Sequence, residues 1–154
     1  MQCPFCQSNQ LFVTNSRPTV KNTQIWRRRK CLSCKESFTT YENINLSYLK
    51  VIKKNGKIQR YNRAKLFVSI YHPASETKNA DRGQTANFAE QIIQEVEIEI
   101  MLRKQKTIST QTILEIVLEK IYKKSPSVFL KYLTYREGNN EKKVIAIIQR
   151  YLSK

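Results

Sequence analysis

The sequence predicts an α+β chain in which a short cysteine-held β-ribbon precedes a β-hairpin and a series of helices. All four cysteines lie within the first 34 of the 154 residues, as two C-x-x-C pairs. An Asn-Gly pair at residues 55–56, between two β-prone segments, is a strong hairpin turn signal. Beyond residue 62, apolar residues recur at helical spacing. These three observations place the strands first and the helices after them.

The charge of the chain is strongly positive and is concentrated in its first part. The protein has 28 Lys and Arg against 12 Asp and Glu, a formal net charge of +16. Residues 1–65 hold 14 basic and 2 acidic side chains, whereas residues 66–154 hold 14 and 10. Such an excess favours nucleic acid as a partner, because each neutralised phosphate releases a counterion. A solvated basic surface is the alternative that charge alone leaves open.

The hydropathy pattern argues against a membrane protein. No window approaches the roughly 18 consecutive apolar residues that a spanning helix needs. The opening residues Met1-Gln2-Cys3-Pro4 lack the basic and apolar regions of a signal peptide. We therefore expect a cytoplasmic protein with no membrane partner and with reduced thiols.

The four cysteines, Cys3, Cys6, Cys31 and Cys34, have the spacing of a structural zinc site. Two residues between thiolates let one turn offer both sulfurs to one ion, and two such turns complete a tetrahedron around Zn²⁺. The ion also replaces the core that a segment of some 40 residues cannot build. Disulfides are disfavoured without a secretion signal, and a redox motif would need one C-x-x-C beside a βαβ pattern.

A basic run precedes the second cysteine pair. As a strand, it places Trp26, Arg28 and Lys30 on one face and Arg27 and Arg29 on the other. The planar fork of arginine binds a phosphate or a guanine edge bidentately. We therefore expect one face to grip phosphates while the other reaches a groove edge, and Trp26 to be a packing residue. A solvated charge run is the alternative.

Further β-prone segments follow. Residues 37–41 are expected to close the ribbon, and residues 46–53 and 57–61 to form the hairpin. Lys53 and Lys65 would approach each other if the next helix folds back over these strands. Lysines that converge with backbone N–H groups can form a triphosphate pocket, whereas a solvated lysine-rich hairpin is the alternative.

The remainder of the chain is expected to be mostly helical. Asn62 is expected to cap a helix that His72-Pro73 ends, and the polar residues 74–87 are expected to form a loop. Three expected helices follow: residues 88–104, a helix capped by Ser109 or Thr110, and residues 126–135. After a break at Gly138-Asn139-Asn140 comes an amphipathic helix whose apolar stripe holds Val144, Ile147, Ile148, Tyr151 and Leu152.

These elements predict three parts: a zinc ribbon at 1–45, a hairpin-and-helix domain at 46–136 and a C-terminal helix at 137–154. The apolar stripes of residues 126–154 exceed what so small a domain covers, so we expect pairing with a second copy of the chain.

An enzyme is not predicted. The single histidine, His72, lies beside a proline at an expected helix end, and no G-x-x-x-x-G-K-[ST] motif is present. Glu95, Glu97 and Glu99 alternate along a helix and therefore do not converge on one ion.

A chain of short motifs runs through the first 66 residues. They are Cys3-Pro4-Phe5-Cys6, Asn15-Ser16-Arg17, Ile25-Trp26-Arg27-Arg28-Arg29-Lys30-Cys31-Leu32-Ser33-Cys34, Ser37-Phe38-Thr39-Thr40-Tyr41-Glu42, Val51-Ile52-Lys53-Lys54-Asn55-Gly56 and Tyr61-Asn62-Arg63-Ala64-Lys65-Leu66. In this order they resemble the bacterial NrdR family, zinc-ribbon and ATP-cone repressors of ribonucleotide reductase genes. Asn15 stands where the family has Asp, Trp26 replaces the first Arg of the basic run, and Phe129 stands where the family has Tyr.

The resemblance implies a rubredoxin-like zinc ribbon followed by a mostly helical ATP-cone domain that opens with a β-hairpin. It implies a repressor that binds double-stranded operator DNA upstream of ribonucleotide reductase genes, with ATP or dATP controlling a homo-oligomeric assembly. DNA contacts would fall on Arg17, Arg27, Arg28 and Arg29, with Lys30 of the same run. Nucleotide contacts would fall on Val51, Lys53, Lys54 and Lys65. The alternative is a zinc-ribbon regulator that binds DNA or RNA and whose ATP-cone no longer senses nucleotide.

Overall fold

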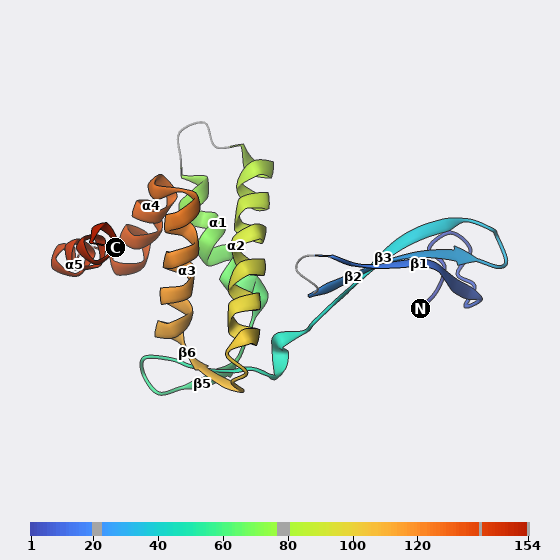
Figure 1. Ribbon diagram of the computed structural model, residues 1–154, viewed down its shortest axis with the longest axis horizontal. Helices are drawn as coiled ribbons and strands as arrows, with labels where there is room; N and C mark the ends of the chain where they lie inside the picture. The colour runs from blue at the N-terminus through green and yellow to red at the C-terminus, as the bar shows by residue number, and fades with distance from the viewer. Residues whose placement is uncertain (20–22, 77–80, 139, 154) are drawn as a thin grey trace. The chain divides into compact units, whose positions relative to one another are not determined.

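The computed structural model describes residues 1–19, 23–76, 81–138 and 140–153. Its chain divides into two compact units, Met1–Asn45 and Leu46–Lys154. The first unit consists of strands, and the second consists of helices that accompany a small sheet (Figure 1). This organisation confirms the predicted α+β class. Two predictions extend beyond the described residues, namely positions 77–80 of the expected loop and Asn139 of the expected chain break.

A three-stranded antiparallel ribbon forms most of the first unit. Its strands, in the spatial order β1-β2-β3, are β1 Leu11–Thr19, β2 Gln24–Cys31 and β3 Ser37–Asn43. The central strand β2 pairs on both edges, with Arg28 opposite Asn15 on β1 and Thr39 on β3. The register shifts between Val13 and Asn15 on β1, whereas the β2–β3 pairing is regular. Alternate residues of β2 therefore point to opposite faces, and the strand expected at residues 37–41 is confirmed.

The second unit begins with a small mixed sheet. Its strands are β4 Lys50–Ile52, β5 Ile58–Arg60 and β6 Thr107–Ser109, in the order β5-β4-β6, with β4 antiparallel to β5 and parallel to β6. The Asn-Gly turn is confirmed, because Gly56 has a φ of +78° and its N–H donates to the carbonyl oxygen of Lys53 at 2.9 Å. The expected strand at 46–53 is wrong at its start, where Leu46–Tyr48 form a 3₁₀ turn, η1, that buries Leu46.

In the described part of the second unit, five α-helices follow or accompany this sheet. They are α1 Arg63–Ser75, α2 Arg82–Leu102, α3 Thr110–Lys124, α4 Pro126–Glu137 and α5 Glu141–Leu152. The expected caps are confirmed at Asn62 and at Ser109, and Ser125 caps α4 in the same way. Each of the three side chains accepts a hydrogen bond from a backbone N–H in the first helical turn. Of the helices in the described residues, none is both long enough and apolar enough to cross a membrane.

Two expected boundaries around α1 and α2 are wrong. The helix continues through Pro73 to Ser75, because a proline in the last turn removes a single backbone hydrogen bond while Pro73 and Ala74 are buried. The expected loop at 74–87 ends earlier, because Asp81 caps α2 by accepting a hydrogen bond from the N–H of Gln84 at 2.7 Å. The first turn of α2 is polar, so its apolar periodicity starts only after the helix has begun.

The core of the second unit lies between α1, α2, α3 and α4. Fully buried residues include Ile70, Ile92, Val96, Val117 and Ile121, each with 0% exposure. Helix α5 has no fully buried residue, although Val144, Ile147, Ile148 and Tyr151 pack against this core. Leu152, expected on the same apolar stripe, is 73% exposed because it is the last residue of the helix.

Candidate functional site

Two similar turns carry the four cysteines of the first unit. In one, the N–H of Gln7 donates to the carbonyl oxygen of Cys3 at 2.9 Å; in the other, the N–H of Lys35 donates to that of Cys31 at 3.1 Å. Gln7 and Lys35 both have positive φ angles, 59° and 65°, and each follows the second cysteine of its pair. The left-handed residue closes each turn tightly, so both thiols of a pair point to the same side.

The four sulfurs converge on one point. The Sγ atoms of Cys3 and Cys34 are 3.6 Å apart, as are those of Cys6 and Cys31, and all four lie within 4.8 Å of one another. Four sulfurs bound tetrahedrally to one zinc ion at about 2.3 Å would be about 3.8 Å apart. The cysteines are free thiols, and 3.6 Å is far too long for a disulfide. The cluster is therefore positioned to bind a metal ion with four protein ligands.

The pKa values of two thiols in this cluster shift in opposite directions. The backbone N–H of Cys34, together with that of Ser33 and with the thiols of Cys6 and Cys34, lowers the pKa of Cys31 to about 6, against the opposing effect of lost hydration. For Cys34, the backbone N–H of Glu36 acts to lower the pKa, but lost hydration and the sulfurs of Cys6, Cys3 and Cys31 together raise it to about 12. Backbone amides thus favour a thiolate at Cys31, the form that binds a metal ion.

The basic side chains of the ribbon fall on two distinct faces. The first, which we call the Arg28 face, carries Arg17, Trp26, Arg28 and Lys30. Arg17 and Trp26 are cross-strand partners, and the guanidinium carbon of Arg17 lies 6.0 Å from the centre of the indole ring. Arg28 is exposed and donates to the hydroxyl of Thr39 at 3.3 Å. In the described part of the ribbon, no carboxylate lies within ion-pair distance of this face.

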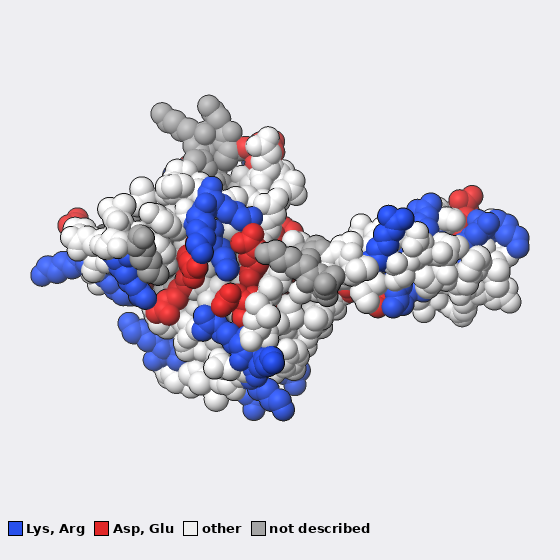
Figure 2. All heavy atoms as spheres, viewed as in Figure 1, with Lys and Arg blue, Asp and Glu red and all other residues white. Residues whose placement is uncertain are grey.

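The opposite face of the ribbon, which we call the Glu42 face, carries Arg27 and Arg29. A nitrogen of Arg27 lies 2.9 Å from the carboxylate of Glu42, and one of Arg29 lies 3.9 Å from the same oxygen. The Nε of Arg29 also donates to the hydroxyl of Thr40 at 2.9 Å. The alternation expected along the run is confirmed, and among the described residues only the Glu42 face pairs its arginines with a carboxylate. Figure 2 shows basic side chains along the ribbon with little acidic surface beside them on the face in view.

A cavity of about 510 Å³ lies in the second unit, and we call it the hairpin cavity. Val51, Lys53, Lys54 and Lys65 all contribute to its lining, so the structure brings together the four residues that the motifs single out. Lys53 and Lys65 come from the β4–β5 hairpin and from the first turn of α1, which meet at this cavity as expected.

The other walls of the hairpin cavity come from residues that were not expected at the site. Tyr61 and Leu66, which flank Lys65 in the same motif, line one side, and Thr110, Tyr132 and Arg136 extend the lining onto α3 and α4. Tyr132 is 2% exposed and packs in the core. No local signal identifies Thr110, Tyr132 and Arg136, because they reach the cavity only through the packing of distant helices.

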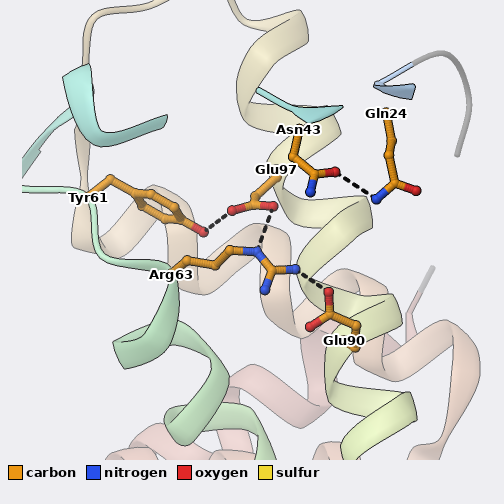
Figure 3. A network of polar contacts seen from close by, with 6 residues as sticks. All are labelled: Gln24, Asn43, Tyr61, Arg63, Glu90 and Glu97. Atoms are coloured by element: carbon orange, nitrogen blue, oxygen red, sulfur yellow. Dashed lines mark hydrogen bonds and ion pairs between the residues drawn. The ribbon is translucent and has the colours of Figure 1, made fainter. Parts of the chain in front are cut away.

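A polar network holds the N-terminal end of α1 against α2 (Figure 3). The hydroxyl of Tyr61 donates to Glu97 at 3.0 Å, and Arg63 donates from its Nε to Glu97 at 3.2 Å and from a terminal nitrogen to Glu90. Burial, followed by the charge of Glu97, raises the pKa of Tyr61, so its hydroxyl remains a donor. The network holds the ring of Tyr61 as a fixed wall of the hairpin cavity.

Comparisons with known proteins match both units. Residues 1–42 match the family described as transcriptional repressor NrdR-like, N-terminal domain, and residues 49–141 match the ATP cone domain. A protein named transcriptional repressor NrdR from Agathobacter rectalis is 35% identical over 138 residues, covering 89% of this chain and 88% of the relative. A protein of the same name from Alkaliphilus oremlandii is 32% identical over 154 residues, covering 99% of this chain and 97% of the relative.

These matches cover both the four-thiol ribbon and the unit that holds the hairpin cavity. Relatives of this kind are named as transcriptional repressors, so the family is one of regulators and not of enzymes. The chain therefore belongs to the NrdR family of transcriptional repressors, with an N-terminal zinc ribbon followed by an ATP-cone.

Proposed function

We propose that this chain is a nucleotide-responsive repressor that binds operator DNA upstream of ribonucleotide reductase genes. The observation that supports this proposal most strongly is the pairing of two features in one chain. In the described part of the first unit, a row of cations without a paired carboxylate lies on the ribbon that carries the four thiols. A cavity lined by lysines lies in the second unit.

The proposed zinc ligands are Cys3, Cys6, Cys31 and Cys34. Four thiols at tetrahedral spacing leave no open coordination position, so the metal is structural. When bound, Zn²⁺ would replace a hydrophobic core in this unit. With its fold held by the metal ion, the ribbon would use its exposed basic side chains for contacts to DNA.

The proposed DNA contacts are Arg17, Arg28 and Lys30 on the Arg28 face, with Arg27 and Arg29 in a supporting role. A phosphate approaching the Arg28 face meets three positive charges and no ion-paired carboxylate among the described residues. On the opposite face, Glu42 already neutralises part of the charge of Arg27 and Arg29. Contacts to phosphates would supply most of the affinity, and the forked guanidinium of Arg28 can read a base edge.

The proposed ligand of the hairpin cavity is ATP or dATP. Lys53, Lys54 and Lys65 supply the positive charge that a triphosphate needs, and Val51 and the ring of Tyr61 supply apolar walls that suit a base. Because the nucleotide and DNA sites lie in different units, nucleotide would act by favouring one homo-oligomeric assembly over another. Such an assembly places ribbons on spaced half-sites, and its coupling to nucleotide is reciprocal.

We expect Arg28→Gln to weaken binding to operator DNA by about tenfold, the scale of one bidentate contact. Arg27→Gln removes the same charge from the Glu42 face, so it is expected to cost less. The measurement is a titration of a fluorescent operator duplex with zinc-loaded protein at fixed salt, with and without ATP or dATP.

A duplex RNA of equal length is the control for simple charge attraction. Equal losses for Arg28→Gln and Arg27→Gln would contradict the assignment of the Arg28 face to DNA. Operator affinity that is the same with ATP, with dATP and without nucleotide would contradict the nucleotide-responsive half of the proposal.

A further inference from the structure

The small sheet of the second unit has one buried face and one exposed face. Val51 and Ile108, which are neighbours across β4 and β6, are both buried. The residues next to them in each strand therefore point to the opposite face. There Arg60, Lys50 and Thr107 form one row across the strand order β5-β4-β6, and all three are exposed.

Two further cations adjoin this row. Lys104 and Lys106 are exposed and lie in the turn that leads from α2 into β6. The N–H of Lys50 donates to the carbonyl oxygen of Lys106 at 2.9 Å, so a backbone hydrogen bond joins the turn to the row. Figure 2 shows basic side chains at the end of the second unit where Figure 1 labels β5 and β6. We call the four cations and the threonine the outer sheet surface: Lys50, Arg60, Lys104, Lys106 and Thr107.

The outer sheet surface has no carboxylate to balance its charge. Residues 46–63 hold six basic side chains and no acidic one, and residues 100–114 hold three and none. In the part of the chain that the structure describes, none of its four cations lies within ion-pair distance of a carboxylate. Lys50 and Arg60 are direct cross-strand partners, and like charges in that position destabilise a sheet.

Two ordinary structural roles do not account for this repulsive pair. Lysines on edge strands discourage pairing with another chain, but Lys50 lies on β4, the central strand. A cation near the C-terminus of a helix complements the helix dipole, which explains Lys104 after α2 but not two cations on neighbouring strands. An anionic partner explains the pair, because it would convert the repulsion into two attractive contacts.

We propose that the outer sheet surface binds the phosphate backbone of duplex DNA, as a second contact of the repressor with its operator. This inference rests on the proposed operator binding and deepens it. The row across three strands spans about 10 Å, which is wider than one phosphate group and suits successive phosphates of a nucleic acid. Because phosphates carry no sequence information, this surface would add affinity and not specificity.

The short connection to the ribbon favours DNA as the partner. Lys50 follows Asn43, the last residue of β3, by seven residues, so the chain keeps the two within about 25 Å of each other. Phosphates of a duplex held by the ribbon are therefore at high effective concentration for the outer sheet surface.

The test is the salt dependence of binding between full-length, zinc-loaded protein and an operator duplex with flanking sequence. The double variant Lys50→Gln, Arg60→Gln is expected to weaken binding about tenfold at fixed salt. It is also expected to reduce the slope of log affinity against log salt by about two, and Lys50→Gln alone by about one. A scrambled duplex of the same length is expected to lose affinity by the same factor.

The double variant Arg82→Gln, Lys142→Gln is the matched control. Both residues are exposed, lie in α2 and α5, and have no ion pair among the described residues. This control removes the same charge from the same unit and is expected to leave the slope nearly unchanged. The Lys50 and Arg60 double variant is expected to unfold at or above the temperature of the parent protein, because it removes a like-charge pair.

The possible outcomes separate this inference from the proposed function. Equal slopes in the parent and in the Lys50 and Arg60 double variant, with the parent still binding its operator, would overturn this inference alone. Equal losses in that variant and in the control would also overturn it, because net charge alone would then explain the effect. A loss seen only with duplex RNA of equal length would assign the surface to RNA and overturn the DNA contact. A parent protein that does not bind the operator would instead overturn the proposed function.

Discussion

Replacing Cys31 with serine is expected to unfold the first unit and to lower operator affinity by at least about a hundredfold, while the second unit stays folded. Within the described part of the first unit, only Cys3 and Cys31 are buried, at 1% and 0% exposure. Most residues of β1 are exposed, so the ribbon has no hydrophobic core beyond the thiol cluster. In small zinc domains the free energy of metal binding, about 10–16 kcal/mol, is in effect the free energy of folding.

The single tryptophan makes this prediction measurable in the intact chain. Trp26 lies in β2, so its fluorescence reports on the first unit alone. The expected result for Cys31→Ser is a red-shifted emission together with a preserved helical circular dichroism signal. Ser33→Ala is the matched control, because Ser33 is exposed in the same turn and its hydroxyl contacts only the side chains of Ser8, at 2.8 Å, and Gln10, at 3.5 Å, among the described residues. Unchanged emission and operator affinity in Cys31→Ser would show that the cluster does not hold the ribbon.

Replacing both Lys53 and Lys65 with glutamine is expected to lower ATP affinity by about a hundredfold. The two lysines approach the hairpin cavity from different elements, β4 with its turn and α1, so the double variant removes two separate contacts to the triphosphate. A hydrogen bond to a charged group contributes about 1.5–3 kcal/mol, and the low end suits these solvent-accessible side chains. The same variant is expected to lose the effect of ATP on operator binding.

Calorimetric titration with ATP measures this loss directly. Lys57→Gln is the matched control, because Lys57 lies in the same hairpin and is absent from the lining of the cavity. Helical circular dichroism and thermal unfolding of each variant show whether the unit has remained folded. Binding of ATP to the double variant with parent affinity would remove Lys53 and Lys65 from the site.

Local signals predicted the parts of the fold that depend on a few adjacent residues. The cysteine spacing predicted the thiol cluster, the Asn-Gly pair predicted the hairpin, and Asn62 predicted the start of α1. The sequence patterns did not predict two features that depend on packing, namely the continuation of α1 through Pro73 and the strand β6. Pro73 remains helical because it is buried, and β6 forms because helix packing places residues 107–109 beside β4.

The candidate sites show the same division. The alternation along β2 was predictable from strand geometry, but the pairing of Glu42 with Arg27 depends on the register between β2 and β3. The hairpin side of the cavity was predictable from its motif, whereas Tyr132 and Arg136 reach it through α4. A sequence motif thus identifies the wall contributed by one segment, and the fold supplies the others.

Titration of metal-free, full-length protein with zinc tests most directly whether a metal-held ribbon presents arginines to DNA. Trp26 emission and binding of the operator duplex are recorded in the same samples as zinc is added. Both signals are expected to rise together and to saturate at one zinc ion per chain, because the same four thiols fold the ribbon and position Arg28. Full operator binding before zinc is added, or a folded ribbon that still fails to bind the duplex, would contradict this mechanism.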